Sequence, residues 1–266
     1  MSRYARMFEL LRTRGEGAFG AFLMLGDPDC QTSALLLDTL VEGGADMIEV
    51  GIPFSDPVAD GPVIQAAAKR ALESGVRVED CFGLIAKFRA KHPDVPVGIL
   101  TYANLVVARP GFMRDAAEAG ADSLLIADVP QLEAEPFARE MAQAGLEPVL
   151  IAAANTPQET LRRIARLSRG YTYCVSRAGI TGTHADGEFD RSLVQRLKDE
   201  GAPPPVFGFG ISEPGHVRSA LHAGAAGVIC GSAIVRLAQE AEQPQRRIAE
   251  FVSTMKAATA QPAAVD

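Results

Sequence analysis

Residues 46–62 are Asp-Met-Ile-Glu-Val-Gly-Ile-Pro-Phe-Ser-Asp-Pro-Val-Ala-Asp-Gly-Pro, and they combine a strand, a long loop and the start of a helix. Apolar residues alternate from Met47 to Ile52 as a strand requires, which puts Glu49 inside a strand. The loop that follows spans about ten residues, longer than the roughly 4–6 of most connections, and such loops often carry function. Two plainer interpretations exist: Glu49 lies on an edge or faces solvent, and Asp60 only caps the helix beginning at Pro62.

Strands and helices alternate in the same way along the whole chain. Glycine ends several helices just before a strand, as in Gly43-Gly-Ala-Asp46 and Ala119-Gly-Ala-Asp122. The predicted strands are 18–25, 46–52, 96–102, 122–127, 147–152, 171–176, 205–209 and 227–230. The predicted helices are 1–14, 31–43, 62–74, 78–92, 110–119, 133–144, 157–167, 190–199, 213–223, 232–239 and 243–257.

Eight strands alternating with helices predict a parallel sheet covered by helices, and eight such units favour a closed barrel. A doubly wound sheet would normally carry Gly-x-Gly-x-x-Gly after its first strand, which Leu25-Gly-Asp-Pro28 does not match. We therefore predict an α/β fold, a single-domain (β/α)8 TIM barrel with an extra N-terminal helix and additional helices after strands two and eight. The predicted domain spans residues 1–257, and residues 258–266 are predicted to be a disordered tail.

The amino-acid composition indicates what kind of protein this is and which partners it can bind. Apolar residues make up 47% and charged residues 22% of the chain, as in globular proteins. A formal charge of -7 without a basic cluster argues against nucleic acid or an anionic membrane as partner. Residues 1–14 lack the apolar core of a secretion signal, so we expect a cytoplasmic protein. The cysteines form no C-x-x-C pair, which favours reduced thiols over disulfides or a zinc site.

Glycine-rich segments follow the last predicted strands. In a TIM barrel the functional residues follow the C-terminal ends of strands, and phosphate often binds after strands seven and eight. Gly208-Phe-Gly-Ile-Ser212 and Cys230-Gly-Ser-Ala-Ile234 lie there, and backbone N–H groups at two helix starts can hold an anion without lysine or arginine. The alternative is that these glycines only permit tight turns with serine caps. Residues 177–187, after strand six, have the composition of a mobile lid.

Lysine and histidine are absent from the predicted strands. Barrel enzymes that cleave carbon–carbon bonds often use a strand lysine as Schiff base or a histidine-bound metal, and neither is available in this pattern. The carboxyl pair Glu49 and Asp60 remains as acid and base beside the phosphate loops. A glutamate in an apolar barrel mouth keeps its proton more readily, because burial disfavours the ionised form.

Short motifs spread over nearly the whole chain match one known family. They are Leu25-Gly-Asp-Pro28, Glu49-Val-Gly-Ile-Pro-Phe-Ser-Asp-Pro-Val-Ala-Asp-Gly-Pro62, Tyr102-Ala-Asn104, Ala127-Asp-Val-Pro130, Arg177-Ala-Gly-Ile-Thr-Gly182, Gly208-Phe-Gly-Ile-Ser212 and Gly231-Ser-Ala-Ile-Val235. Through them the chain closely resembles the α subunit of tryptophan synthase. The resemblance implies a TIM barrel that splits indole-3-glycerol phosphate into indole and glyceraldehyde 3-phosphate. It also implies an α2β2 complex in which a β subunit consumes the indole and carries pyridoxal phosphate, with no cofactor and no metal in this chain.

The resemblance also implies roles for individual residues. Glu49 would protonate indole C3 and take the proton from the glycerol hydroxyl next to the broken bond. Asp60 would hydrogen-bond the indole nitrogen as positive charge develops there, so that the protonated indole ring is the electron sink. The implied substrate contacts are Phe22, Leu100, Tyr102, Leu125, Tyr173, Thr181 and Ile229. The implied phosphate contacts are Gly182, Phe209, Gly210, Gly231 and Ser232, and the implied β-subunit contacts are Asp56, Pro57 and Asn104.

Three other functions stay open at this point. A phosphate-sugar isomerase can share the Gly-Phe-Gly and Gly-Ser loops, but it would release no indole from indole-3-glycerol phosphate. A non-catalytic partner would only activate a β subunit, and the intact pair of Glu49 and Asp60 argues against it. A stand-alone indole-releasing lyase would share the same motifs and act without a partner.

Overall fold

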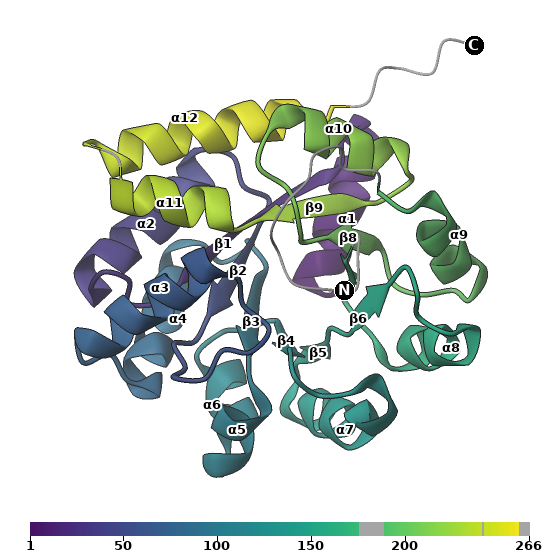
Figure 1. Cartoon of the computed structure of the whole chain (residues 1–266), viewed down its shortest axis with the longest axis horizontal. Coiled ribbons are helices and arrows are strands. Elements are labelled where there is room, and N and C mark those ends of the chain that lie inside the picture. Colours follow the sequence, from purple (N-terminus) through teal and green to yellow (C-terminus); the bar gives the residue numbers. More distant parts are fainter. Residues whose placement is uncertain (176–188, 241, 261–266) are drawn as a thin grey trace.

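Nine parallel strand segments form one sheet in the computed structural model, which describes residues 1–175, 189–240 and 242–260. The segments are β1 Ala18–Met24, β2 Met47–Gly51, β3 Val97–Thr101, β4 Ser123–Ile126, β5 Glu147–Pro148, β6 Ile151–Ala153, β7 Thr172–Val175, β8 Pro205–Phe207 and β9 Gly227–Cys230. They lie side by side in the order β5-β4-β3-β2-β1-β9-β8-β7-β6. Figure 1 shows this sheet curling around a central axis with helices on its outer side.

The two ends of that order, β5 and β6, are parts of one predicted strand, 147–152. The first part continues the pairing with β4, because the N–H of Val149 donates to the carbonyl of Leu124 at 3.1 Å. The second part pairs with β7, and the N–H of Tyr173 donates to the carbonyl of Leu150 at 3.0 Å. Pro148 is still paired with Leu124, and the break between the two parts falls at residues 149 and 150. The predicted eight-stranded barrel is therefore confirmed, with its fifth strand in two pieces.

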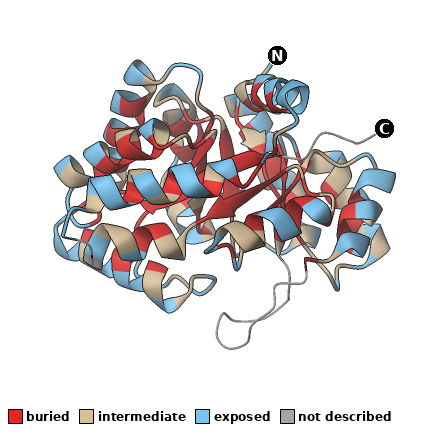
Figure 2. Cartoon of the chain, turned by 90° about the horizontal axis from the view of Figure 1, so that it is seen from above, coloured by how far each residue is buried: buried red, intermediate tan, exposed pale blue. Residues whose placement is uncertain are grey.

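Helices cover the outside of the barrel, with buried faces toward the strands and exposed faces outward (Figure 2). They are α1 Arg3–Arg14, α2 Cys30–Glu42, α3 Pro62–Glu73, α4 Val78–Lys91, α5 Ala103–Ala108, α6 Phe112–Glu118, η1 Gln131–Glu133, α7 Ala134–Ala144, α8 Gln158–Leu167, α9 Arg191–Asp199, α10 Pro214–His222, α11 Ser232–Glu240 and α12 Pro244–Ala257. The predicted extra helices are present as α1, α3 with α4, and α11 with α12. The sequence pattern does not indicate α5 and η1, because six and three residues are too few to show a helical period.

Side chains alternate between two buried layers along each strand. On β2, Ile48 and Val50 point outward and pack among the helices, whereas Met47 belongs to a separate cluster inside the barrel. Glu49 lies two residues after Met47 and therefore shares its inward face. Across the described part of the chain, no helix combines the length and apolar character that crossing a membrane requires.

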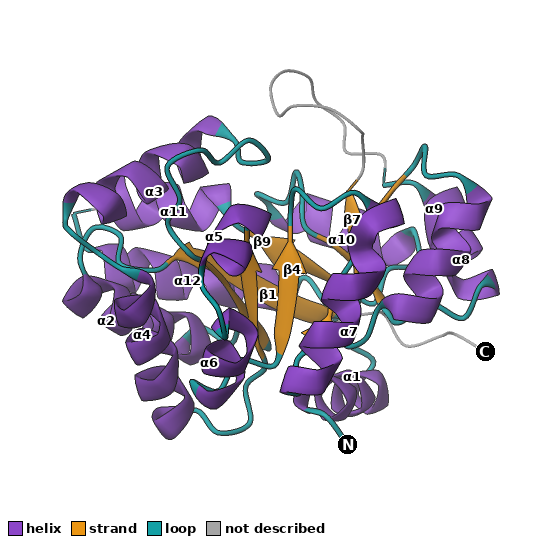
Figure 3. Ribbon diagram, turned by 90° about the horizontal axis from the view of Figure 1, so that it is seen from below, coloured by secondary structure: helices purple, strands orange, loops and turns teal. Residues whose placement is uncertain are grey.

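Helix α1 lies at the end of the barrel where the strands begin (Figure 3). Its buried residues are Tyr4, Met7 and Leu11, which share one face of the helix. All three belong to the cluster inside the barrel rather than to the layer between strands and helices. Tyr4 reaches the first residue of β4, where its hydroxyl lies 2.9 Å from Ser123 Oγ. The helix therefore closes the N-terminal end of the barrel.

The start of the predicted tail needs correction. Residues 258–260 pack against the barrel: the carbonyl of Thr259 accepts a hydrogen bond from the N–H of Gly17 at 3.0 Å, and Ala260 bridges to Glu16. Thr259 is fully buried. Thr259 is polar and comes just after a helix, so its sequence context alone predicts a tail. The backbone hydrogen bond with the distant Gly17 holds Thr259 in place. Residues 261–266 lie outside the described residues.

Candidate active site

Glu49 lies in the middle of β2 with its carboxyl inside the barrel. It is 3% exposed and is in register with Phe22 of β1 and Gly98 of β3. The hydroxyl of Tyr171 donates a hydrogen bond to Glu49 Oε1 at 2.9 Å. Glycine at position 98 leaves room for the neighbouring hydroxyl groups, because a Cβ there would lie 2.7 Å from Ser123 Oγ and 2.9 Å from the hydroxyl oxygen of Tyr4. The structure thus places Glu49 inside the barrel and not on an edge or toward solvent.

The surroundings of Glu49 suit a group that exchanges a proton near neutral pH. Burial raises the pKa of Glu49 to about 7, the hydrogen bond from Tyr171 opposes this rise, and the negative charge of Asp60 adds to it. Both the acid and the carboxylate are then populated near pH 7. A single carboxyl in this position can both donate and accept a proton during a reaction.

Asp60 lies near the end of the loop between β2 and α3, and it is half-buried. Burial raises its pKa, while hydrogen bonding with the Tyr102 hydroxyl acts in the opposite direction. Tyr102 also holds this loop, because its hydroxyl accepts a hydrogen bond from the N–H of Ala59 at 3.2 Å. The residue that caps α3 is Gly61, without a side-chain hydrogen bond, so Asp60 is not the helix cap.

The predicted substrate contacts largely gather inside the barrel. Phe22, Leu125, Tyr173 and Ile229 belong to the interior cluster, and Leu100 packs against it. These side chains come from β1, β4, β7, β9 and β3. Tyr102 is buried above β3 and stacks on Phe54 with ring centroids 5.2 Å apart. Flat and branched apolar side chains around one carboxyl form a wall suited to an aromatic ring. Thr181 lies outside the described residues.

Two glycines keep aromatic side chains of this wall in place. A Cβ at Gly208 would lie 2.0 Å from the ring of Tyr173, and a Cβ at Gly51 would lie 2.8 Å from the ring of Phe22. Any larger residue at either position would force the aromatic ring to move. The glycine of the Gly-Phe-Gly motif therefore shapes the apolar wall as well as the loop after β8.

The loops after β8 and β9 lie side by side. The thiol of Cys230 donates to the carbonyl of Ile211 at 3.0 Å, which joins the end of β9 to the loop after β8. Gly210 has a φ of 77°, a conformation that favours glycine. Gly231 precedes α11, and Ser232 is the first residue of that helix. An anion site built from backbone N–H groups would draw on both of these neighbouring loops. Phe209 contacts Tyr173 edge to face, at 6.3 Å between centroids, and Gly182 lies outside the described residues.

The predicted partner contacts are accessible on the loops after β2 and β3. Asp56 and Asn104 are exposed, and Pro57 is half-buried. Large apolar side chains are also exposed on the segments that follow β2, β3 and β4: Val58 is 79%, Val107 69% and Leu132 65% exposed. Sequence reasoning missed these three residues, because the loop after β2, the helix α5 and the turn η1 that carry them are too short to show a periodic pattern. An exposed apolar group of this kind is typical of a protein interface.

Sequence reasoning also missed Tyr171, the residue that contacts Glu49 directly. The available signal is its spacing from Tyr173, because residues two apart in a strand face the same side. Within the described residues, no group of three histidine, cysteine, aspartate or glutamate side chains is placed to hold a metal ion. The cysteines are all free thiols.

A closed (β/α)8 barrel with a buried carboxyl of raised pKa and glycine loops after its last two strands fits the class of TIM-barrel enzymes that use acid–base chemistry. The family model described as tryptophan synthase alpha chain matches residues 8–263. The tryptophan synthase alpha chain of Serratia proteamaculans is 50% identical over 266 residues, covering 97% of this chain and 99% of that protein. The chain therefore belongs to the tryptophan synthase alpha chain family.

Solved structures agree with this assignment. The tryptophan synthase subunit alpha from Legionella pneumophila has a TM-score of 0.89 and 30% identity, covering 97% of this chain and 98% of that chain. A structure of Mycobacterium tuberculosis tryptophan synthase has a TM-score of 0.89 and 30% identity, covering 98% of this chain and 99% of that one. The chain is thus a lyase of tryptophan biosynthesis, of the family that cleaves indole-3-glycerol phosphate.

Proposed function

We propose that Glu49, assisted by Asp60, carries the retro-aldol cleavage of indole-3-glycerol phosphate to indole and glyceraldehyde 3-phosphate. The observation that supports this assignment is the buried Glu49 carboxyl, whose pKa of about 7 lets it hold a proton inside an apolar barrel. An aromatic ring against Phe22 and Leu125 would lie beside this carboxyl, because both residues share the barrel interior with it. Acid–base catalysis by one positioned carboxyl then accounts for the reaction.

The proton makes a closed cycle on Glu49. The protonated carboxyl gives its proton to indole C3, and the ring nitrogen acquires positive charge. The resulting carboxylate takes the proton from the glycerol hydroxyl next to the bond that breaks. The electron pair of that carbon–carbon bond returns to the ring, which releases neutral indole and an aldehyde. Glu49 regains its proton at the end, so no oxidant, metal or cofactor takes part in these steps.

Asp60 has the complementary role in this proposal. Its carboxylate accepts a hydrogen bond from the indole N–H and stabilises the positive charge that develops on the ring. Such a hydrogen bond is stronger in the half-buried loop than in water, because the local dielectric is lower. Tyr102 keeps the loop near the barrel through its hydrogen bond with Ala59. In this proposal the indole ring lies between Asp60, in the loop after β2, and Glu49, inside the barrel.

The phosphate of the substrate is assigned to the loops after β8 and β9. In the barrel order, β1 with Phe22 lies between β2, which carries Glu49, and β9. A substrate can therefore place its ring against β2 and β1 and its phosphate at Gly210, Gly231 and Ser232. The family resemblance adds Gly182 to this site, and Thr181 to the other substrate contacts. We also assign Phe209, in the loop after β8, to the contacts with the substrate phosphate.

We also propose that this chain works with a β subunit. Val58, Val107 and Leu132 are exposed on the segments after β2, β3 and β4, and the first two of these segments also carry Asp56, Pro57 and Asn104. This exposure supports a protein partner at the loop that carries Asp60. In the proposed α2β2 complex the partner carries pyridoxal phosphate and consumes the indole, while this chain needs no cofactor. We expect the complex to work in the cytoplasm. Residues 1–260 would then act as one domain followed by a short tail.

The test is indole release from indole-3-glycerol phosphate by the Glu49→Gln variant. An amide cannot give or take the proton, so we expect the rate to fall by at least about 100-fold. Glu73→Gln, an exposed glutamate of α3, is the matched control and should keep the full rate. The assay is run with and without a β subunit, which separates a subunit from a stand-alone lyase. Full indole release by Glu49→Gln would exclude the role assigned here, and no indole from the unmodified chain would favour an isomerase.

A further inference from the structure

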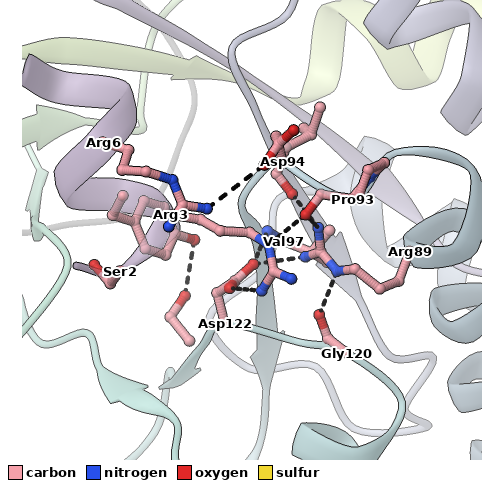
Figure 4. Close-up of polar contacts among 12 residues, drawn as sticks. Ser2, Arg3, Arg6, Arg89, Pro93, Asp94, Val97, Gly120 and Asp122 are labelled. Atoms are coloured by element: carbon pink, nitrogen blue, oxygen red, sulfur yellow. Dashed lines mark hydrogen bonds and ion pairs between the residues drawn. The ribbon is translucent and has the colours of Figure 1, made fainter. Parts of the chain in front are cut away.

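Two arginines and one aspartate hold α1 against the N-terminal end of the barrel. Arg3 Nη1 lies 2.8 Å from Asp122 Oδ1, and Arg89 Nη2 lies 2.7 Å from Asp122 Oδ2. Arg3 Nε also donates to the carbonyl of Pro93 at 2.6 Å, and Asp122 Oδ2 accepts the N–H of Val97 at 2.8 Å. Figure 4 shows the two guanidinium groups converging on the same carboxylate from α1 and α4.

Tyr4 extends this contact into the barrel. It follows Arg3 directly, is 1% exposed, and its hydroxyl lies 2.9 Å from Ser123 Oγ at the start of β4. Its ring packs on the ring of Tyr171, with centroids 5.3 Å apart. The hydroxyl of Tyr171 in turn donates to Glu49 Oε1 at 2.9 Å. A continuous set of contacts therefore runs from the surface residue Arg3 to the carboxyl of Glu49.

We propose that α1 is a seal for the barrel and that Arg3 is a positioning residue for Glu49: by pairing with Asp122, Arg3 keeps Tyr4 over the N-terminal end of the barrel and excludes water from the Glu49 carboxyl. This inference rests on the proposed function, in which Glu49 must hold a proton. Arg3 touches no substrate and acts only through Tyr4 and Tyr171.

Exclusion of water is the factor that decides the protonation of Glu49. Burial is the largest cause of its raised pKa, and the titratable groups that face it are Asp60, Tyr4, Tyr171 and Tyr173. No cation is among the groups that act on this pKa in the described part of the chain. Water entering from the α1 end would stabilise the carboxylate and lower the pKa. If the Tyr171 ring moved, water could take over its hydrogen bond to the carboxylate, so the added hydration would decide the direction of the pKa change.

Arg3 can be changed without removing the helix. Asp122 would keep Arg89 and the N–H of Val97 as partners, so no buried charge is left alone. Met7 and Leu11 would still pack inside the barrel. Loss of Arg3 should therefore loosen the first turn of α1, where Tyr4 lies, and leave the fold intact. Arg6 lies on the same turn and pairs with the exposed Asp94 at 3.6 Å, which makes it the matched control.

Tyrosine fluorescence reports the titration of Glu49 without substrate. The chain has four tyrosines and no tryptophan, so no other emission masks theirs. All four are buried, namely Tyr4, Tyr102, Tyr171 and Tyr173. A tyrosine that donates to a carboxylate loses fluorescence, because its excited state gives up the proton, so emission should change as Glu49 ionises. The Glu49→Gln variant identifies this transition, since it must be missing there.

The experiment compares the midpoint of this transition among variants of the full-length chain. We expect about 7 for the unmodified chain, a decrease of roughly half to one pH unit for Arg3→Gln, and an unchanged midpoint for Arg6→Gln. Arg3→Lys restores the charge at Asp122 and should recover most of the decrease. A merely structural role of Arg3 would lower the urea midpoint of unfolding but leave the Glu49 transition in place. An unchanged or increased midpoint in folded Arg3→Gln overturns the proposal.

Tyr4→Leu provides a second test should Arg3→Gln fail to fold. The shorter side chain leaves space above Tyr171 and should lower the midpoint in the same direction, and an unchanged midpoint there also overturns the proposal. Because the titration needs no substrate, its outcome is independent of the proposed reaction. If Glu49→Gln released indole at the full rate, the proposed function would fail while the Arg3 effect on Glu49 could still be measured. If indole release needed Glu49 but Arg3→Gln left the midpoint unchanged, only the seal would fail.

Discussion

At the scale of single residues, Tyr171 and burial act on Glu49 in opposite directions. The hydroxyl stabilises the carboxylate at 2.9 Å, whereas burial disfavours it more strongly and raises the pKa to about 7. We predict that Tyr171→Phe moves this pKa upward by about one pH unit, because a hydrogen bond to a charged group is removed while the ring still excludes water. The measurement is the pH dependence of indole release.

The sign follows from the form of Glu49 that starts the reaction. Cleavage begins with the protonated carboxyl, so the rate is retained below the pKa and falls as pH rises through it. In Tyr171→Phe this fall should occur at higher pH than in the unmodified chain. The Arg3→Gln variant should move the fall to lower pH, which makes the two variants controls for each other. A fall at the same or lower pH in Tyr171→Phe would show that the hydroxyl does not stabilise the carboxylate.

At the scale of elements, α3 fixes the loop that carries Asp60. Arg70 of α3 makes two hydrogen bonds with Asp27 after β1, with Nε to Oδ1 at 2.8 Å and Nη2 to Oδ2 at 2.7 Å. Asp27 is buried, so the pair links α3 firmly to the end of β1. We predict that Arg70→Gln destabilises the chain by about 3 kcal/mol, because a buried carboxylate loses its partner. It should also lower the rate of indole release, since Asp60 begins the turn before α3.

Lys69 provides the control for this prediction. It is the neighbouring cation on α3, is exposed, and lies 3.7 Å from the exposed Glu73. A surface pair of this kind contributes little, so Lys69→Gln should keep both the stability and the rate. Urea unfolding and indole release are measured on both Arg70→Gln and Lys69→Gln, and only Arg70→Gln should lose stability and activity. Equal stability of the two variants would mean that the Arg70 and Asp27 pair does not hold α3.

The elements also show why the sequence predicts the barrel but not all of its site. Period-two alternation places Glu49 and Phe22 inside, since every strand repeats the same rule over a local stretch. The break between β5 and β6 depends on two different neighbours, β4 and β7, and the contact of Tyr171 with Glu49 joins residues 122 positions apart. Thr259 is held by Gly17 from the other end of the chain. Such long-range pairings leave no local pattern, and α5 is too short to show one.

At the scale of the whole molecule, the burial of Glu49 lowers the stability of the folded chain at neutral and higher pH. The pKa of Glu49 rises from an ordinary 4.5 to about 7 on folding, so the folded chain binds more protons than the unfolded chain between these values. Stability must therefore fall as pH rises through this window. Gln at position 49 carries no charge at any pH and escapes this loss. We predict that the free energy of unfolding of Glu49→Gln, relative to the unmodified chain, increases by about 2–3 kcal/mol from pH 5 to pH 8.

Urea unfolding at pH 5, 6.5 and 8 measures this difference on the same pair of proteins that tests catalysis. Other groups titrate equally in both chains, so the difference isolates position 49. Glu73→Gln, where the glutamate is exposed, should show a difference that does not change with pH. A constant difference for Glu49→Gln would mean that the carboxyl ionises as readily in the folded barrel as in the unfolded chain. In that case the barrel could not hold the proton that the proposed cleavage uses, and the link between burial and catalysis would be lost together with the stability effect.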